Sequence, residues 1–193
     1  MAETATKIER DYPRTVKLQD GSSATLRLMT PKDDKSVLGF AKALPPDDLL
    51  FLRTDITDPA VVKEWVENLG EGRTVTVLAE VKGEIAGYAS LHHSQVTWQR
   101  HVGEIRIQVG SRYRSQGLGR RLAAEIFAIA RDLDLRKITA QMTPDQKGAI
   151  ATFERLGFQP EALLQDFVID RAGRTRDLMI MAHDVAGFTD RAD

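Results

Sequence analysis

The segment Arg114–Gly119, with the sequence Arg-Ser-Gln-Gly-Leu-Gly, combines residue types that suit the binding of a phosphate group. Gly117 and Gly119 let the backbone curl, so that successive N–H groups point toward one spot. A helix that begins there adds partial positive charge from its dipole. Arg114 and Arg120 supply cations on either side. This pattern predicts a pyrophosphate-binding loop that consists of Arg114, Ser115, Gln116, Gly117, Leu118, Gly119 and Arg120.

Two common phosphate-binding motifs do not match this segment. The dinucleotide-binding motif Gly-x-Gly-x-x-Gly/Ala would need glycine or alanine where Leu122 stands. The nucleotide-binding loop of ATPases ends in Gly-Lys-Ser/Thr, and the sequence does not contain that triplet. An ordinary glycine-rich turn at the start of a surface helix remains the alternative to a phosphate site.

Length and composition limit the classes of protein that are possible. The 193 residues suffice for one domain with a substantial core, and 42% apolar and 28% charged residues are typical of globular proteins. A net charge of −1 argues against a nucleic-acid partner. The absence of cysteine excludes disulfides, thiolate nucleophiles and cysteine–zinc sites. No stretch resembles a signal peptide or a membrane span, so we expect a cytoplasmic protein without a membrane partner.

A strand and a helix are expected to position the glycine-rich segment. Residues 102–109 alternate like a strand, with Ile105, Ile107 and Val109 on one face and Glu104, Arg106 and Gln108 on the other. Residues 120–133 follow as a helix with an apolar stripe of Leu122, Ile126, Ile129 and Leu133. The loop therefore joins the end of a strand to the start of a helix.

The rest of the chain also alternates between strands and helices. Capping signals at Thr30, Asp58 and Thr143 each begin a helix, and Gly70 is expected to end the second of them in a left-handed conformation. The strand candidates are residues 24–28, 74–81, 85–92, 137–142, 165–169 and 175–182. The resulting order is β-α-α-β-β-β-α-β-α-β-β.

This order and three motifs resemble the GNAT acetyltransferase family. The motifs are residues 109–122, the segment Phe153–Phe158, and Leu26-Arg27-Leu28 followed by Thr30-Pro31-Lys32-Asp33. The resemblance implies an α/β fold with a mixed, mostly antiparallel sheet, helices on both faces and a splayed strand pair. Residues 14–185 are expected to form this single domain, between a flexible segment at 1–13 and a tail at 186–193. Within the family, residues 18–21, 117–122 and 177–178 are most similar to the acetyltransferase domain of bacterial protein-lysine acetyltransferases.

The resemblance implies that acetyl-CoA is the acetyl donor and that no metal takes part. Its pantetheine would pair with the backbone of Ile107, Gln108 and Val109, and its pyrophosphate would lie on the glycine-rich segment. Gln146 stands where the family often has a cofactor-binding asparagine, although a helix-capping role is an equal alternative. Phe153 replaces a tyrosine that protonates the leaving thiolate in many members, so the thiolate would leave without a dedicated acid, or water or Tyr113 would supply that proton. Phe153 itself would pack in the core and against the cofactor.

Transfer of acetyl to an amine requires a base, because a lysine amine with a pKa near ~10.4 is almost fully protonated at neutral pH. Glu104 is the candidate base, since it lies on the polar face of the strand that leads into the glycine-rich segment. A structural ion pair between Glu104 and Arg106 is the alternative interpretation. His92, His93 and His101 are secondary candidates for the base.

The acceptor is less well defined by the sequence than the donor. The resemblance favours the side chain of a protein lysine as the acceptor amine. A small-molecule amine is one alternative, and a domain that binds acetyl-CoA as a sensor without catalysis is another. The resemblance also makes a homodimer possible, because many members of the family form one.

Overall fold

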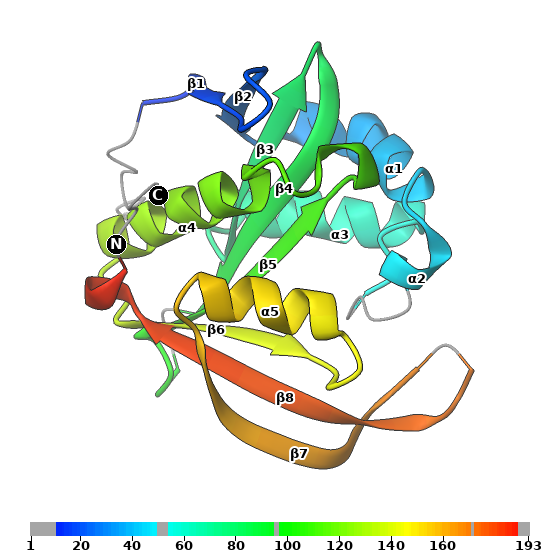
Figure 1. Cartoon of the computed structure of the whole chain (residues 1–193), viewed down its shortest axis with the longest axis vertical. Helices are drawn as coiled ribbons and strands as arrows, with labels where there is room; N and C mark the ends of the chain where they lie inside the picture. Colours follow the sequence, from blue (N-terminus) through cyan, green and yellow to red (C-terminus); the bar gives the residue numbers. More distant parts are fainter. Residues whose placement is uncertain (1–10, 50–53, 95–96, 171, 189–193) are drawn as a thin grey trace.

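The computed structural model describes residues 11–49, 54–94, 97–170 and 172–188. Its centre is one eight-stranded sheet in the order β1-β2-β3-β4-β5-β6-β8-β7. The strands are β1 (Arg14–Lys17), β2 (Ser23–Leu28), β3 (Thr74–Val81), β4 (Glu84–His93), β5 (Val102–Val109), β6 (Lys137–Met142), β7 (Gln159–Ile169) and β8 (Thr175–Asp184). Neighbouring strands are antiparallel except for β5 and β6, which run parallel (Figure 1).

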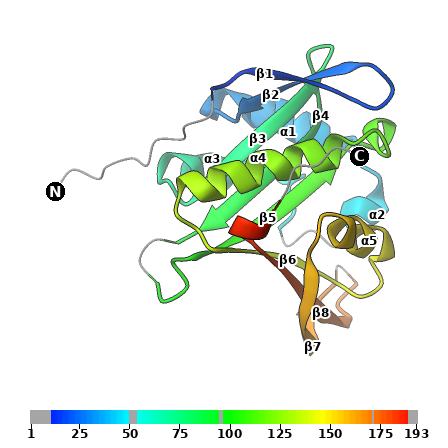
Figure 2. The same ribbon diagram turned by 60° about the vertical axis from the view of Figure 1, so that its left-hand side comes forward.

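Helices cover both faces of this sheet. The α-helices are α1 (Asp34–Lys42), α2 (Pro46–Leu49), α3 (Pro59–Gly70), α4 (Leu118–Asp132) and α5 (Lys147–Arg155). Three short 3₁₀ turns, η1 (Pro31–Asp33), η2 (Ser111–Tyr113) and η3 (Val185–Gly187), join them to their neighbours. Figure 2 shows α4 in front of the central strands, with α1 and α3 behind them. The mixed sheet with helices on both faces confirms the fold expected from the sequence.

Two separate cores result from the alternation of side chains along the central strands. On β4, Ala89 and Leu91 belong to the core under α4, whereas Tyr88 belongs to the core under α1 and α3. The apolar stripe of α4 drives the first core, because Leu122, Ile126 and Ile129 are fully buried in it. Truncation of one such side chain to alanine typically costs about 2–5 kcal/mol of stability.

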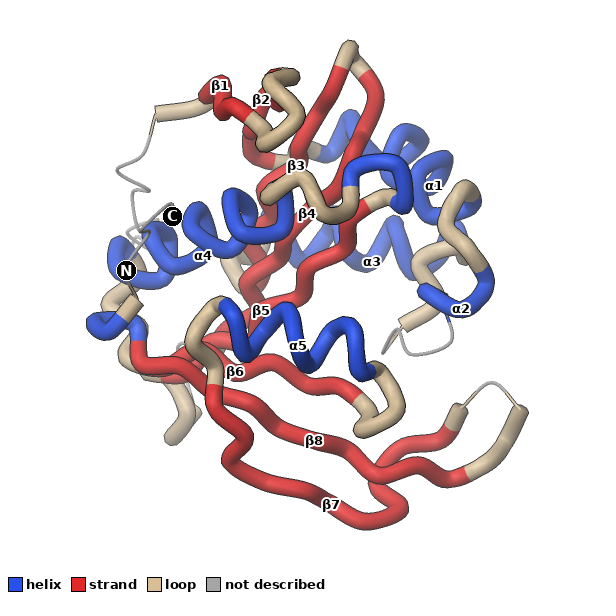
Figure 3. Tube along the Cα trace, viewed as in Figure 1, coloured by secondary structure: helices blue, strands red, loops and turns tan. Residues whose placement is uncertain are grey.

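The strands β5 and β6 separate soon after they begin. Their pairing covers Val102↔Lys137, Gly103↔Ile138 and Glu104↔Thr139. From Ile105 onward, β5 pairs with β4 alone, while β6 pairs with β8 along its whole length. This fork is the splayed strand pair expected from the sequence, and Figure 3 shows β5 and β6 parting.

The helix starts predicted at Thr30 and Asp58 are confirmed, whereas the start predicted at Thr143 was wrong, because α5 begins at Lys147 with Gln146 as its N-cap residue. Asp58 accepts a hydrogen bond from the Ala60 N–H at 2.8 Å and begins α3. The Thr30 N–H donates to the Asp33 carboxylate at 2.8 Å before α1. The prediction for Gly70 was wrong, because Gly70 is the last residue of α3, Glu71 is its C-cap, and the left-handed residue is Gly72, with φ of +67°.

Two strands differ from the sequence prediction. β1 was missed because it is a four-residue strand at the sheet edge, where half of its side chains face solvent. β7 starts at Gln159 rather than at residue 165, and its pairing with β8 shifts register twice, which disrupts the alternation that a sequence pattern detects. Both strands lie outside the central four.

Residues at the two ends of the described chain pack on α4. The Tyr12 hydroxyl donates to the buried Glu125 carboxylate at 2.8 Å, and the Phe188 ring stacks on Phe127 with centroids 3.9 Å apart. The remainder of the predicted flexible segment and tail, residues 1–10 and 189–193, lies outside the described residues. Among the described residues, no helix has the length and apolar character needed to cross a membrane.

Candidate active site

The glycine-rich segment forms a compact turn at the N-terminus of α4. Ser115 and Gly117 are both left-handed, with φ of +59° and +80°, and Gly117 is the N-cap residue of the helix. Left-handed residues alternating with ordinary ones direct successive N–H groups to one side and form an anion-binding nest. The first-turn N–H groups of α4 have no carbonyl partner within the helix. The turn therefore has the donor-rich character that the sequence predicted.

Arg114 is directed away from this turn in the structure. Its Nε donates to the Val109 carbonyl at 3.2 Å, and its terminal nitrogen forms an ion pair with Asp48 at the end of α2. This ion pair connects the glycine-rich turn to α2. These contacts use Nε and one terminal nitrogen of the five-donor guanidinium.

The turn between β1 and β2 supports the glycine-rich turn from outside. The Gln19 N–H donates to the Gln116 carbonyl at 3.0 Å. A Cβ placed on Gly117 would lie 3.5 Å from Cγ of Gln19, so the two turns are in van der Waals contact. The Gln116 side chain donates to the Arg112 carbonyl at 3.1 Å. Gln19 belongs to the motif at residues 18–21, but its contact with the glycine-rich turn was not predicted, because its partner Gln116 is nearly one hundred residues away in the chain.

The edge of β5 that faces the fork offers its main-chain groups. The Gly110 N–H donates to the Ala86 carbonyl at 2.9 Å, which fixes the alternation of the antiparallel β4–β5 ladder. In that ladder Gln108 exchanges hydrogen bonds with β4, whereas Ile105, Ile107 and Val109 turn their N–H and C=O groups toward β6. Because β6 has already diverged, these groups face the gap between the two strands.

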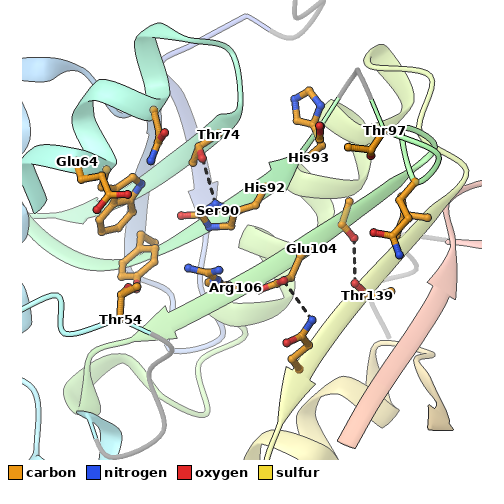
Figure 4. Close-up of a pocket in the computed structure, with 18 of the residues that line it drawn as sticks. Thr54, Glu64, Thr74, Ser90, His92, His93, Thr97, Glu104, Arg106 and Thr139 are labelled. Atoms are coloured by element: carbon orange, nitrogen blue, oxygen red, sulfur yellow. Dashed lines mark hydrogen bonds and ion pairs between the residues drawn. The ribbon is translucent and has the colours of Figure 1, made fainter. Parts of the chain in front are cut away.

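A cavity of about 690 Å³ lies beside α3, on the face of the sheet opposite α4. Figure 4 shows its floor, which the strands β4, β5 and β6 form together. The polar lining includes Glu64, Asn68, Thr74, Ser90, His92, His93, Glu104, Arg106, Thr139 and Gln141. The apolar wall includes Ile56, Val61, Trp65 and Tyr88.

Glu104 occupies the fork at the floor of this cavity. It belongs to the last residue pair before β5 and β6 separate. Its carboxylate accepts a hydrogen bond from Arg106 Nε at 3.0 Å and one from Gln141 Nε2 at 3.3 Å. The ion pair between Glu104 and Arg106, the alternative interpretation from the sequence, is therefore present in the structure. Glu104 nevertheless also lines the cavity.

Burial favours the neutral form of two groups that line the cavity with Glu104, Tyr88 and His93. Burial raises the pKa of Tyr88 to about 12, so its phenol stays neutral. Burial lowers the pKa of His93, which favours its neutral form. His92 lies directly opposite Glu104 on β4, and its Nδ1 is 3.1 Å from the Thr74 hydroxyl. His101, the third histidine considered from the sequence, does not line the cavity.

Gln146 and Phe153 both make structural contacts near α5. Gln146 is the N-cap residue of α5, and its Oε1 accepts a hydrogen bond from the Thr143 N–H at 2.9 Å, which closes the turn before the helix. Phe153 is 8% exposed and packs edge-on against Phe158, with ring centroids 4.9 Å apart. Tyr113 packs against the core under α4. Within the described part of the chain, no group of three or more His, Cys, Asp or Glu residues could hold a metal ion.

A donor-rich turn, an open strand edge and a cavity that meet at a fork between parallel strands define a class of protein that transfers a group between two bound molecules. Residues 48–158 match the acetyltransferase (GNAT) family, and the chain belongs to that family. It is an acetyl-CoA-dependent acetyltransferase.

Three proteins illustrate the range of its similarities. YwnH of Bacillus subtilis (strain 168), named as a phosphinothricin acetyltransferase, is 23% identical over 164 residues, which are 84% of this chain and 99% of YwnH. The structure of yncA from Salmonella typhimurium with acetyl-CoA has 21% identity and a TM-score of 0.72, over 89% of this chain and 98% of that one. The GNAT domain of S. lividans PAT has 18% identity and a TM-score of 0.72, over 90% and 99% of the two chains.

Proposed function

We propose that this acetyltransferase acetylates the primary amine of a small molecule held in the cavity beside α3, with Glu104 as the base. The observation that carries the proposal is the location of Glu104 at the fork. There the gap between β5 and β6 meets the floor of the cavity. An acetyl donor in the gap and an acceptor in the cavity would both reach this carboxylate.

The donor would be held by the residues expected from the sequence, with one difference in detail. The main-chain groups of Ile107 and Val109 face the gap and suit hydrogen bonding to an extended chain. Gln108 directs its main-chain groups to β4, so its part is to hold β5 in register. The N–H groups from Ser115 to Gly119, with Arg114 and Arg120, would hold the pyrophosphate. Gln146 and Phe153 would act indirectly, by fixing α5 beside the fork.

Acetyl-CoA supplies a thioester carbonyl that a neutral amine can attack. The acceptor enters as an ammonium ion, and Glu104 takes one proton from it, directly or through a water. The C–N bond then forms as the C–S bond breaks, and the second amine proton leaves as the amide forms. Phe153 has no proton to give to the departing sulfur. In this proposal the sulfur therefore receives the second amine proton through water.

The cavity favours a small molecule over the protein lysine expected from the sequence. Its volume of about 690 Å³ lies within the usual range for small-molecule sites and exceeds what one lysine side chain fills. The name of YwnH also points to a small-molecule acceptor. The likeness to the GNAT domain of S. lividans PAT supports the protein-lysine alternative only at the level of the fold.

An acceptor screen tests this proposal. The purified chain is incubated with acetyl-CoA and either a panel of small primary amines or a panel of lysine-containing peptides and intact proteins, and products are detected by mass spectrometry. Reactions without the chain correct for spontaneous acetylation. We expect acetylated products among the small amines and none above background among peptides and proteins. Catalysed acetylation of protein lysines alone would overturn the small-molecule assignment.

A further inference from the structure

The Arg114 guanidinium uses only part of its hydrogen-bonding capacity within the protein. Its Nε donates to the Val109 carbonyl at 3.2 Å, and its Nη2 forms an ion pair with the Asp48 carboxylate. These contacts engage two of the five N–H groups that a guanidinium presents in a planar fork. The side chain is 45% exposed. Arg114 can therefore bind an anion while it keeps both present contacts.

Asp48 is held more firmly than the arginine that it contacts. Leu44 and Leu49, on either side of it in the chain, pack in the core under α1 and α3. The Asp48 N–H donates to the Pro45 carbonyl at 3.0 Å, and the carboxylate-bearing side chain is only 18% exposed. A long, exposed arginine side chain has much more rotamer freedom to lose. Asp48 is thus the fixed partner of this ion pair, and Arg114 is the group that it holds.

The guanidinium of Arg114 is held between the two parts of the proposed donor site. Val109 is the last residue of β5, the strand whose open edge would pair with the pantetheine, and Arg114 begins the glycine-rich turn. Figures 1 and 2 both show α2 on the side of the molecule toward which β5 and β6 part. An extended chain that follows β5 toward the glycine-rich turn would therefore meet Arg114 at the end of the strand.

We propose that Asp48 is a positioning residue for donor binding, because it holds Arg114 ready to contact the pyrophosphate of acetyl-CoA where that group joins the pantetheine. The inference rests on the donor placement proposed above. Asp48 acts through Arg114 and does not touch the donor. Since Arg114 is ordered before the donor arrives, less rotamer freedom is lost when the donor binds. The guanidinium then bridges a protein carboxylate and a phosphate oxygen by charge-assisted hydrogen bonds.

Repulsion between Asp48 and the bound phosphates is the smaller of two opposing effects. Both side chains of the ion pair are partly exposed, so salt screens the repulsion over a Debye length of about 8 Å. The Arg114 guanidinium would also lie between the two anions and offset part of the charge of each. Ordering of a long side chain, by contrast, changes affinity by up to about 10-fold. We therefore expect Asp48 to favour donor binding.

A double-mutant cycle on Asp48 and Arg114 tests the inference, with the Kd for acetyl-CoA measured by calorimetric titration. Asp48→Ala should raise this Kd by about 3- to 10-fold, and Arg114→Ala should raise it by at least ~10-fold. In the Arg114→Ala background, Asp48→Ala should have no further effect. Asp48→Asn keeps an acceptor oxygen for Arg114 and should weaken binding less than Asp48→Ala does. Asp34→Asn removes an exposed acid from the first turn of α1 and should leave the Kd within about twofold of the wild type.

A truncated donor separates positioning from a general structural role. S-acetylpantetheine carries the thioester but has no pyrophosphate for Arg114 to contact. At millimolar concentration it should raise the unfolding temperature of the wild type and of Asp48→Ala by the same amount. Acetyl-dephospho-CoA keeps the pyrophosphate and lacks only the 3′-phosphate, so it should show the full effect of Asp48→Ala. Thermal unfolding of each variant without ligand shows whether the fold is kept.

Each of the other outcomes overturns the inference in an identifiable way. If Asp48→Ala binds acetyl-CoA more tightly than the wild type, the carboxylate competes with the donor. Unchanged binding means that the ion pair has no part in donor recognition. Equal weakening for acetyl-CoA and S-acetylpantetheine, or equal weakening with and without Arg114, means that Asp48 acts only on the fold. Undiminished affinity in Arg114→Ala removes the arginine from the donor site and overturns that part of the proposed function too. No acceptor enters these titrations, so they are independent of the acceptor screen.

Discussion

Gly117 and Gly119 serve the glycine-rich turn in different ways. Gly117 has φ of +80°, a conformation that strains any residue with a side chain. Gly119 has an ordinary helical backbone, and a Cβ placed on it would meet only Cγ2 of Val109, at 3.8 Å. The backbone of Gly117 is thus required by the fold, whereas Gly119 is required only if a ligand approaches the first turn of α4.

Replacement of Gly119 by glutamate should separate stability from cofactor binding. A carboxylate in the first turn of α4 lies near the positive end of the helix dipole and should raise the stability of the free protein by about 0.3–1 kcal/mol. It should also repel the pyrophosphate and weaken acetyl-CoA binding by at least ~10-fold. Calorimetric titration with acetyl-CoA and thermal unfolding measure the two effects. Gly119→Gln has nearly the same shape without the charge, so it should bind much better than Gly119→Glu; equal, undiminished binding by both variants would contradict the pyrophosphate assignment.

At the scale of single residues, the sequence predicted which residues share a face of a strand better than it predicted the contacts that those residues make. Strand alternation correctly put Glu104 and Arg106 on one face, because a strand of eight residues repeats every second position. It could not decide between a base and an ion pair, since that choice depends on the cavity formed by α3 and three strands. Gln19 and the second partner of Arg114, Asp48, were not predicted because both contacts join turns that only the folded sheet brings together.

The connection from β2 to α1 shows how a single element is fixed in place. Arg27 on β2 donates to both oxygens of Asp33, at 2.9 and 2.7 Å, and also contacts Glu80 on β3. The Thr30 N–H donates to the same Asp33 carboxylate. These contacts hold the pKa of Asp33 at about 2 although burial acts in the opposite direction. The ion pair thus locks the start of α1 to the sheet.

Acid should weaken the ion pair between Arg27 and Asp33 within a defined range of pH. The folded-state pKa of Asp33, about 2, lies below its ordinary value of 3.8, so folding favours the charged carboxylate. The stabilisation, on the order of 2 kcal/mol, is complete above pH ~4 and is lost as the pH falls toward 2. Asp33→Asn should therefore lower the free energy of unfolding at pH 7 by about that amount and should flatten its decline between pH 4 and 2, as measured by urea titrations. Asp34→Asn, at the exposed neighbouring position, should cost less than ~1 kcal/mol; the same loss in both variants would contradict a specific role for Asp33.

At the scale of elements, the central strands and the long helix were predictable because each carries one clear period. The strands β3, β4, β5 and β6 and the helix α4 match the predicted ranges to within about two residues. The sheet edges were less predictable. β1 is too short for a pattern, and β7 bends at two register shifts, near Pro160 and Leu164. Such irregularities depend on pairing with a neighbour, which the local sequence does not encode.

For the whole molecule, the proposed function makes the parallel pair β5–β6 the feature that would join the donor site to the acceptor site. On one face of the sheet, α4 presents its N-terminus beside the end of β5; on the other face, α3 forms a wall of the cavity (Figure 2). An intact sheet would separate the two faces. Because β5 and β6 separate after Glu104 and Thr139, the gap between them would connect the two proposed binding regions through the sheet.

The measurement that tests this account most directly is the acetyl-transfer rate of Glu104→Gln compared with the wild type, with acetyl-CoA affinity measured in parallel. With the best acceptor from the screen, we expect turnover at pH 7 to fall by about 10²–10⁴-fold while the Kd for acetyl-CoA stays within about twofold. The rate of the variant should then rise with pH toward the pKa of the acceptor amine, because a free amine no longer needs the base. Wild-type turnover in Glu104→Gln at pH 7 would remove Glu104 from the mechanism and, with it, the assignment of the fork as the catalytic centre.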